Sequence, residues 1–219
     1  MRVLVACECS GRVRDAFRAL GHDAMSCDMK PTEVPGPHYT GDIRDILANG
    51  WDLMVAHPPC TYLSRAGARW WKSPGRDELA TEAAAFVQLL WNAPIERIAI
   101  ENPIGQLNTR WRYPDQTIQP WWFGDPFTKA TCLWLKNLPP LIATCVTAER
   151  TPFLPSNVGK GKRDGQKWSR GVARSATDAS RTFPGIARAM AEQWGLSPIR
   201  GTSTQYTLFQ AKESSAAPQ

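Results

Sequence analysis

Cys60 and Glu101 are the two side chains whose types and positions best suit chemistry. Cys60 ends the run His57-Pro58-Pro59-Cys60, which directly follows the apolar stretch 53–56. Two prolines cannot continue a strand and they stiffen the loop, so the thiol is held at a strand end, where it is placed for attack. Glu101 and Asn102 follow another apolar stretch and precede a proline. Glu101 is either an acid beside the thiol, if the two strands are neighbours, or a surface residue of a turn.

Two aspartates follow predicted elements earlier in the chain. A strand, a turn with glycine, a helix and then an acid at the end of the next strand form the plan of a nucleotide-type cofactor site, and Asp28 is the acid here. The turn holds one glycine, Gly11, where a dinucleotide site has three, so this motif alone favours ordinary α/β packing. Asp42 is either the N-cap of a short helical turn or a partner for an adenine amino group, and its spacing favours the N-cap.

Short apolar stretches alternate with stretches of helical periodicity, which predicts an α/β domain with a parallel sheet. The segment 105–128 is rich in proline, tryptophan and glutamine and is predicted to be irregular. Its aromatic residues are expected to pack on the core rather than stack on bases. The predicted strands are 3–6, 24–27, 53–56, 95–100 and 131–135, the helices 13–20, 77–91 and 184–194, and the aromatic residues Trp111, Trp121, Trp122 and Phe123.

The composition predicts one domain in reducing cytosol. The 219 residues are 42% apolar, enough for a substantial core. Six cysteines without a CxxC pair, and only three histidines, argue against a zinc site and a disulfide framework. No apolar segment approaches the length of a membrane span, and the first residues lack a signal pattern. The formal charge of +6 modestly favours a polyanionic partner such as nucleic acid.

A basic, glycine-containing region follows the predicted sheet between residues 157 and 181. It is either a solvated loop or a strip that follows nucleic-acid phosphates. The polar stretch 197–219 is expected to be disordered. The candidate phosphate contacts are Lys160, Lys162, Arg163, Lys167, Arg170 and Arg174.

Taken together, Asp28, Asp42, Pro58-Pro59-Cys60 and Glu101-Asn102 resemble, in type and order, the C5-cytosine DNA methyltransferase family. The similarity covers about residues 1–195 and is to the short members found in phages and prophages. It implies a Rossmann-like fold that binds S-adenosylmethionine on a mostly parallel seven-stranded sheet, in the cytoplasm of a bacterial host. It also implies a catalytic domain over 1–140, a very short target-recognition region over 141–181, a closing helix over 182–196 and a tail over 197–219.

The resemblance assigns roles residue by residue. Cys60 attacks C6 of the cytosine, Glu101 bonds ring N3 and the exocyclic amine, and Asn102 positions the loop. Asp28 holds the ribose hydroxyls and Asp42 the adenine edge of the cofactor. Further cofactor contacts fall on Glu8, Ser10, Gly11 and Pro58. The implied partner is duplex DNA with a flipped cytosine, bound by a monomer.

The chain departs from the family pattern at three places. The first motif lacks the usual aromatic residue and several glycines, and His57 replaces a small residue before the prolines. The late Gln-Arg-Arg motif is absent, and Lys129 stands where it could supply the missing cation. In the tail, Gln205 to Phe209 resembles the short peptide by which bacterial enzymes dock on the replication sliding clamp.

The chemistry explains why these residue types are needed. C5 of cytosine is too electron-poor to take a methyl cation, but a thiolate added at C6 makes C5 nucleophilic. The thiol of Cys60 therefore needs a lowered pKa or a nearby base. Glu101 must be protonated when it stabilises the charge developing at N3, and we expect a desolvated pocket to raise its pKa.

Other functions use related motifs. Amino-methyltransferases carry an aromatic residue where Cys60 stands, and zinc deaminases need a second cysteine where Leu63 stands, so both are disfavoured. A non-catalytic nucleic-acid-binding module stays open, as does a methyltransferase that acts on RNA or on a free cytosine nucleotide.

Overall fold

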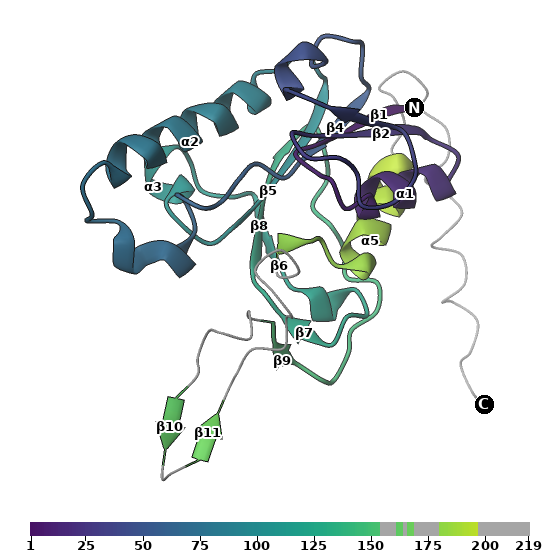
Figure 1. The fold of residues 1–219 in the computed structure, drawn as a ribbon. Coiled ribbons are helices and arrows are strands. Elements are labelled where there is room, and N and C mark those ends of the chain that lie inside the picture. The colour runs from purple at the N-terminus through teal and green to yellow at the C-terminus, as the bar shows by residue number, and fades with distance from the viewer. Residues whose placement is uncertain (154–160, 164–165, 169–179, 197–219) are drawn as a thin grey trace, which may run out of the picture.

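The computed structural model describes residues 1–153, 161–163, 166–168 and 180–196. Its centre is a seven-stranded sheet in the order β3-β2-β1-β4-β5-β8-β6 (Figure 1). The sheet strands are β1 (Arg2–Ala6), β2 (Asp23–Asp28), β3 (His38–Thr40), β4 (Leu53–Ala56), β5 (Arg97–Pro103), β6 (Gln116–Ile118) and β8 (Thr131–Lys136). Only β8 runs against the other six, so the predicted α/β class and the mostly parallel sheet are confirmed.

The order of the sheet creates a crevice at its carboxyl edge. The chain builds outward from β1 to β2 and β3, then returns to place β4 on the other side of β1. In a doubly wound sheet, ligands bind where the direction of building reverses. Here that point lies between β1 and β4, and the loops after these two strands flank it.

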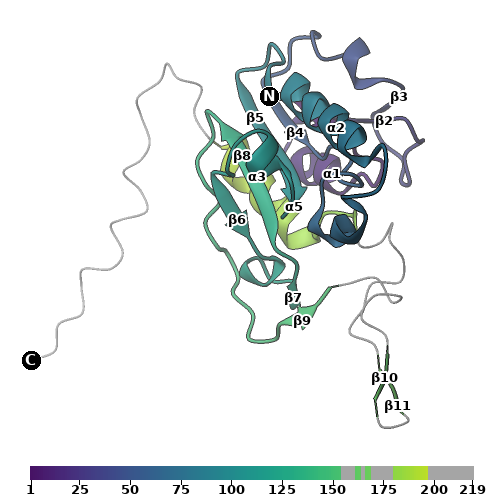
Figure 2. The same cartoon turned by 90° about the vertical axis from the view of Figure 1, so that its left-hand side faces the viewer.

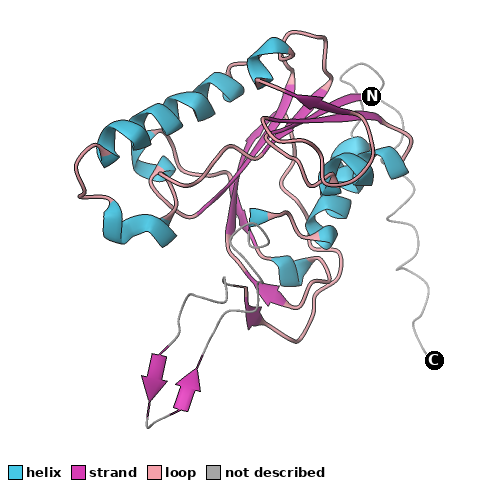
Figure 3. Ribbon diagram, in the orientation of Figure 1, coloured by secondary structure: helices cyan, strands magenta, loops and turns pink. Residues whose placement is uncertain are grey.

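Both faces of the sheet are covered, which is why its central strands are apolar throughout (Figure 3). On one face α1 (Arg12–Ala19) and α5 (Pro184–Gly195) pack against side chains such as Val5 and Val55. On the other face α2 (Arg76–Trp91) and α3 (Leu107–Arg110) pack against side chains such as Leu4 and Met54. Figure 2 shows α2 and α3 on their side of the sheet, with α1 and α5 behind it.

Shorter elements connect the sheet. Most of segment 105–128 is loop, as predicted. It also contains α3, η3 (Pro120–Trp122) and the strands β6 and β7 (Phe127–Thr128). Phe123 is buried as predicted, and Trp111 packs against Trp91 and Trp134. The remaining elements are η1 (Ile43–Asp45), η2 (Arg65–Trp70), β9 (Thr151–Pro152), β10 (Gly161–Arg163) and β11 (Gln166–Trp168).

The strand that carries Glu101 is longer than predicted. The expectation was a strand over 95–100 with Glu101 beyond its end, but β5 runs through Pro103. The antiparallel strand β8 accounts for this, because its residues from Thr131 onward pair with the last residues of β5. Glu101 therefore sits on a rigid strand instead of a turn, which corrects the alternative of a surface residue.

Several predictions fall outside the described residues. Of the candidate phosphate contacts, Lys160, Arg170 and Arg174 are not described, and for Lys162, Arg163 and Lys167 only the backbone of β10 and β11 is. The tail and the peptide Gln205 to Phe209 are also outside. The closing helix is present as α5. Among the helices of the described ranges, none is long and apolar enough to cross a membrane.

Arg14 is a buried cation that ties the loop after β2 to α1. Its guanidinium donates to Asp15, to the hydroxyls of Ser26 and Thr32, and to the carbonyls of residues 34 and 35. Since the side chain has no exposed surface, these bonds cannot be replaced by water.

We predict that Arg14→Met lowers the free energy of unfolding by about 3 kcal/mol, because it removes the hydrogen bonds that tie the loop after β2 to α1 and takes this donor from the buried Ser26 hydroxyl. Urea denaturation followed by circular dichroism measures the change. Arg18→Met, an exposed position on the same helix, is the control and should change it by less than about 0.5 kcal/mol. Equal effects at both positions would contradict the role assigned to Arg14.

Candidate active site at the carboxyl edge of the sheet

The side chains predicted to do chemistry come from two neighbouring strands. Strands β4 and β5 pair in parallel, with Ala56 beside Ile100. The next residues, His57 and Glu101, therefore also stand side by side. This confirms that the loop of the thiol and the strand of the acid are adjacent.

Glu101 is held by His57. The ring Nδ1 lies 3.1 Å from Oε2 of Glu101, and the two side chains are only 11% and 14% exposed. The backbone N–H of His57 donates to the carbonyl of Ala6, which keeps this residue in line with the sheet. His57 was noted in the sequence only as a departure from the family pattern, and its partnership with Glu101 was not predicted.

Asn102 holds the proline loop, as its predicted role requires. Its buried side-chain amide donates to the carbonyl of Pro58 over 2.9 Å. Beyond the prolines, the carbonyl of Cys60 accepts the N–H groups of Leu63 and Ser64, which closes a turn around the thiol. The half-buried thiol is therefore fixed at one side by β5 and at the other by its own turn.

A second contact joins the segments that follow Cys60 and Glu101. The backbone of Gln106 donates to the carbonyl of Leu63, and the backbone of Arg65 donates to that of Ile104. Gly105 lies between them, where a Cβ atom would stand 1.9 Å from the Leu63 oxygen. Only glycine allows this approach, so the position of the thiol relative to the acid depends on it.

Burial and nearby charges set the pKa values of Cys60 and Glu101, and the pKa of Glu101 differs from the expected one. Burial raises the pKa of the Cys60 thiol and Glu101 adds to the rise, while Lys129 opposes it. Burial alone would raise the pKa of Glu101, but the hydrogen bond and charge of His57, together with Lys129, leave that pKa below its usual value. The expected raised pKa of Glu101 was wrong for this reason. At neutral pH the site therefore holds an ionised acid and a neutral thiol.

Lys129 lies near both groups, as the sequence suggested for a replacement cation. Its charge acts on Cys60 and on Glu101. Its backbone N–H donates to Oε1 of Gln119, and its Nζ lies 5.9 Å from the centre of the Phe183 ring. Phe183 directly precedes α5, so the last helix of the fold contributes to placing this lysine.

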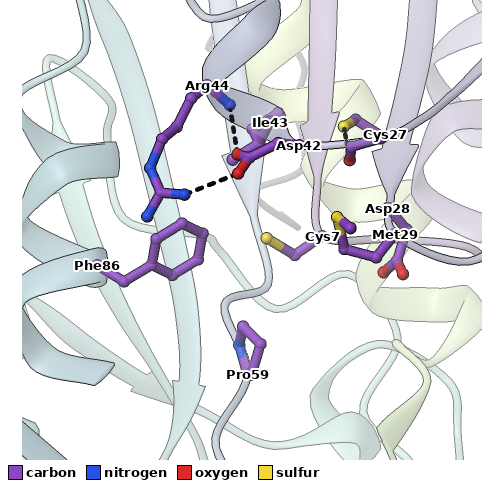
Figure 4. A pocket seen from close by; sticks show the side chains of 10 residues that line it. Cys7, Cys27, Asp28, Met29, Asp42, Ile43, Arg44, Pro59 and Phe86 are labelled. Atoms are coloured by element: carbon purple, nitrogen blue, oxygen red, sulfur yellow. Dashed lines mark hydrogen bonds and ion pairs between the residues drawn. The ribbon is translucent and has the colours of Figure 1, made fainter. Parts of the chain in front are cut away.

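The two aspartates line one pocket at the same edge of the sheet (Figure 4). The pocket has a volume of about 220 Å³ and is lined by Asp28, Asp42, Cys7, Pro59 and Phe86 among others. Asp42 also caps η1 and pairs with Arg44, which confirms the N-cap interpretation. Because Pro59 belongs to the loop of Cys60, the pocket adjoins the thiol. The lining includes Pro59 where Pro58 was predicted.

Glu8, Ser10 and Gly11 surround the start of α1. Oε1 of Glu8 accepts the Ser10 hydroxyl and the backbone N–H of Val13, so a carboxylate of the chain itself occupies the positive end of this helix. Oε2 of Glu8 is buried without a partner among the described residues. These three residues are not part of the pocket lining described above, so their predicted cofactor contacts stay predictions.

Some lining residues were missed by the sequence argument. Cys7 has a left-handed backbone with φ of 58°, a conformation that is uncommon for non-glycine residues. Burial and the nearby Asp28 raise its pKa to about 12. Phe86 comes from the middle of α2, where helical spacing gives no sign of a ligand contact. Phe86 could be recognised as a lining residue only from the tertiary structure, which brings α2 to the pocket.

Comparison with known proteins adds no assignment. The chain matches no family model, and a search of curated proteins finds no relative. In the described part of the chain, no group of three or more histidine, cysteine, aspartate or glutamate side chains is placed to hold a metal ion.

We predict that Gly105→Ala lowers the free energy of unfolding by about 1–3 kcal/mol, because the added methyl group forces the two loops apart. Urea denaturation tests this. Gly67→Ala is the matched control, since its Cβ would have no neighbour closer than 3.5 Å, and it should be neutral or slightly stabilising. A neutral Gly105→Ala would mean that the loops separate without cost.

Proposed function

We propose that this protein transfers a methyl group from S-adenosylmethionine to C5 of cytosine in DNA, through a covalent bond between Cys60 and C6. The observation that carries the proposal is the meeting of Cys60, Glu101 and Asn102 at one edge of the sheet, beside a pocket with two aspartates. The mostly parallel seven-stranded sheet agrees with the fold that the family resemblance implies.

The charges around the pocket favour S-adenosylmethionine as the cofactor. Arg44 also lines the pocket and is paired with Asp42, so Asp28 leaves the lining with a net negative charge. Glu8 already fills the helix end at which a dinucleotide would place its pyrophosphate. These features disfavour a ligand with phosphates and favour one with hydroxyls and a positive charge. S-adenosylmethionine has both, in its ribose and its sulfonium. The pocket volume of about 220 Å³ is below the usual range for whole ligands and suits the nucleoside part.

Cys60 and Glu101 act on opposite sides of the cytosine ring. The sulfur of Cys60, once it has lost its proton, forms a bond to C6 and makes C5 nucleophilic. Bound S-adenosylmethionine would supply the methyl group for C5. Loss of the C5 proton breaks the sulfur–carbon bond and frees the thiolate. Glu101 and Lys129 are placed to stabilise the ring while the adduct exists.

DNA is the substrate best supported by the charge and the resemblance. A formal charge of +6 suits a polyanion, and a base inside a duplex must flip out to reach a half-buried thiol. A binding module without catalysis is the alternative from another class. RNA and free cytosine nucleotides are alternative acceptors.

We predict that Cys60→Ser abolishes transfer of labelled methyl groups, because the alcohol is a much weaker nucleophile than the thiolate. Duplex DNA, single-stranded DNA, RNA and free cytosine nucleotide are compared as acceptors. Cys145→Ser, which removes an exposed free cysteine, is the control and should keep wild-type activity.

The covalent step has its own measurement. Fluorine at C5 cannot leave as the proton does, so DNA with 5-fluorocytosine should trap wild type and Cys145→Ser as adducts that survive denaturation. Label transferred equally by Cys60→Ser and wild type would remove this thiol from the mechanism.

We predict that Asp28→Asn weakens binding of S-adenosylmethionine about 10- to 100-fold, the effect of losing one hydrogen bond to a charged group. Isothermal calorimetry measures it. Asp23→Asn, at the opposite end of the same strand, is the control and should leave the affinity unchanged. Wild-type protein without any affinity for this cofactor would favour the binding module.

A further inference from the structure

His57 contacts the acid of the proposed site more directly than any other described side chain. Parallel pairing of β4 with β5 places the two residues side by side, and Nδ1 lies 3.1 Å from Oε2 of Glu101. With Glu101 ionised, Nδ1 must carry the hydrogen, so the histidine donates to the carboxylate. This pair is built into the sheet and is not an accident of a surface loop.

The second ring nitrogen of His57 has no partner in the part of the chain that the structure describes. Nε2 is buried and makes no hydrogen bond to any residue in the described ranges. A buried polar atom without a partner is costly and calls for an explanation. An atom that exchanges protons with water or with a bound ligand would account for it.

The proposed chemistry needs a proton that Glu101 does not hold. When the thiolate adds to C6, negative charge develops at ring N3, and a proton delivered there stabilises it. The acid that faces N3 is ionised in the free protein because His57 and Lys129 hold it so. Some neighbouring group must therefore supply the proton.

We propose that His57 supplies this proton through Glu101, which makes the pair a proton relay for the methylation reaction. The inference rests on the proposed function. His57 does not touch the cytosine ring in this scheme, so it is a positioning and proton-supplying residue that acts through the glutamate.

The relay balances over one turnover. A proton enters at Nε2 from water, and the Nδ1 hydrogen passes to Oε2 of Glu101. The glutamic acid gives its proton to N3 as the bond between sulfur and C6 forms. When the C5 proton leaves to solvent and that bond breaks, the N3 proton returns to the carboxylate and from there to Nδ1 of His57, and Nε2 gives its proton back to water. The proton that Cys60 lost to solvent before the attack returns to the freed thiolate. The only net proton released is the one that was on C5.

Three charged or titratable groups belong to this arrangement besides His57. Glu101 on β5 contacts His57 directly, while Lys129 between β7 and β8 and Cys60 in the loop that His57 begins both interact with Glu101. All three are unchanged in a His57 variant, so a difference in pH dependence reports on the histidine.

The decisive variant is His57→Asn. Its amide can still donate to Glu101 from nearly the position of Nδ1, but it cannot take up a proton. A structural role predicts that this variant works like the wild type, whereas the relay predicts a loss of about 10²- to 10³-fold in single-turnover methyl transfer. Its affinity for S-adenosylmethionine, measured by calorimetry, should stay within twofold and shows that it is folded.

The matched control is His22→Asn. His22 also has a buried Nε2 without a partner among the described residues, but it lies before β2, away from the carboxyl edge. It should keep full activity. The double variant His57→Asn/Glu101→Gln should be no slower than the slower single variant, because residues that act as one unit are not additive.

The pH profile of the wild type gives a test that needs no variant. Because the pKa of the thiol is raised, thiolate chemistry alone would make the rate climb about tenfold per unit between about pH 7 and 9. In the relay, Nε2 must take up a proton before the attack, and rising pH opposes this step while it favours the thiolate, so the rate levels off over this range. In His57→Asn the climb returns.

The outcomes separate the two proposals. Wild type that transfers no methyl group to any acceptor would overturn the function and the relay together. Active wild type with an equally active His57→Asn, or with a rate that climbs through the whole range, would overturn the relay alone. Losses that multiply in the double variant would also overturn it.

Discussion

The pairing of β4 with β5 is the constraint on which the site depends. It sets His57 against Glu101 and lets Asn102 reach the carbonyl of Pro58. A shift of one residue would turn Glu101 to the opposite face of the sheet. The buried side chains of both strands prevent such a shift, because each face packs against its own helices. The precision of the site is therefore a consequence of the core.

The electrostatics of the site follow from burial combined with close partners. Burial works against ionisation of both Cys60 and Glu101, yet only the acid has a hydrogen-bonding partner strong enough to reverse the effect. A buried carboxylate beside an imidazole and a lysine is stable, whereas a thiolate beside that carboxylate is not. The Cys60 thiol therefore stays protonated, which lowers its reactivity.

The start of α1 carries its own internal anion. Glu8 satisfies donors at the start of α1 that phosphate-binding folds leave for their ligand. The single glycine of this turn, Gly11, has φ of 76° and stands against the side chains of Val34 and Arg14, so it serves the packing of the turn. What looked in sequence like a depleted glycine motif is a complete turn with its own internal anion.

Local pattern determined the central strands, the long helices and the loop that carries Cys60, because buried apolar runs and prolines act within a few residues. The three-residue strands β3 and β6 escaped detection, since they exist only through their neighbours. The reversal of β8, the extension of β5 and the contact of His57 with Glu101 were decided by the tertiary structure alone. Each depends on which strands lie side by side, and that follows from packing between residues distant in the chain.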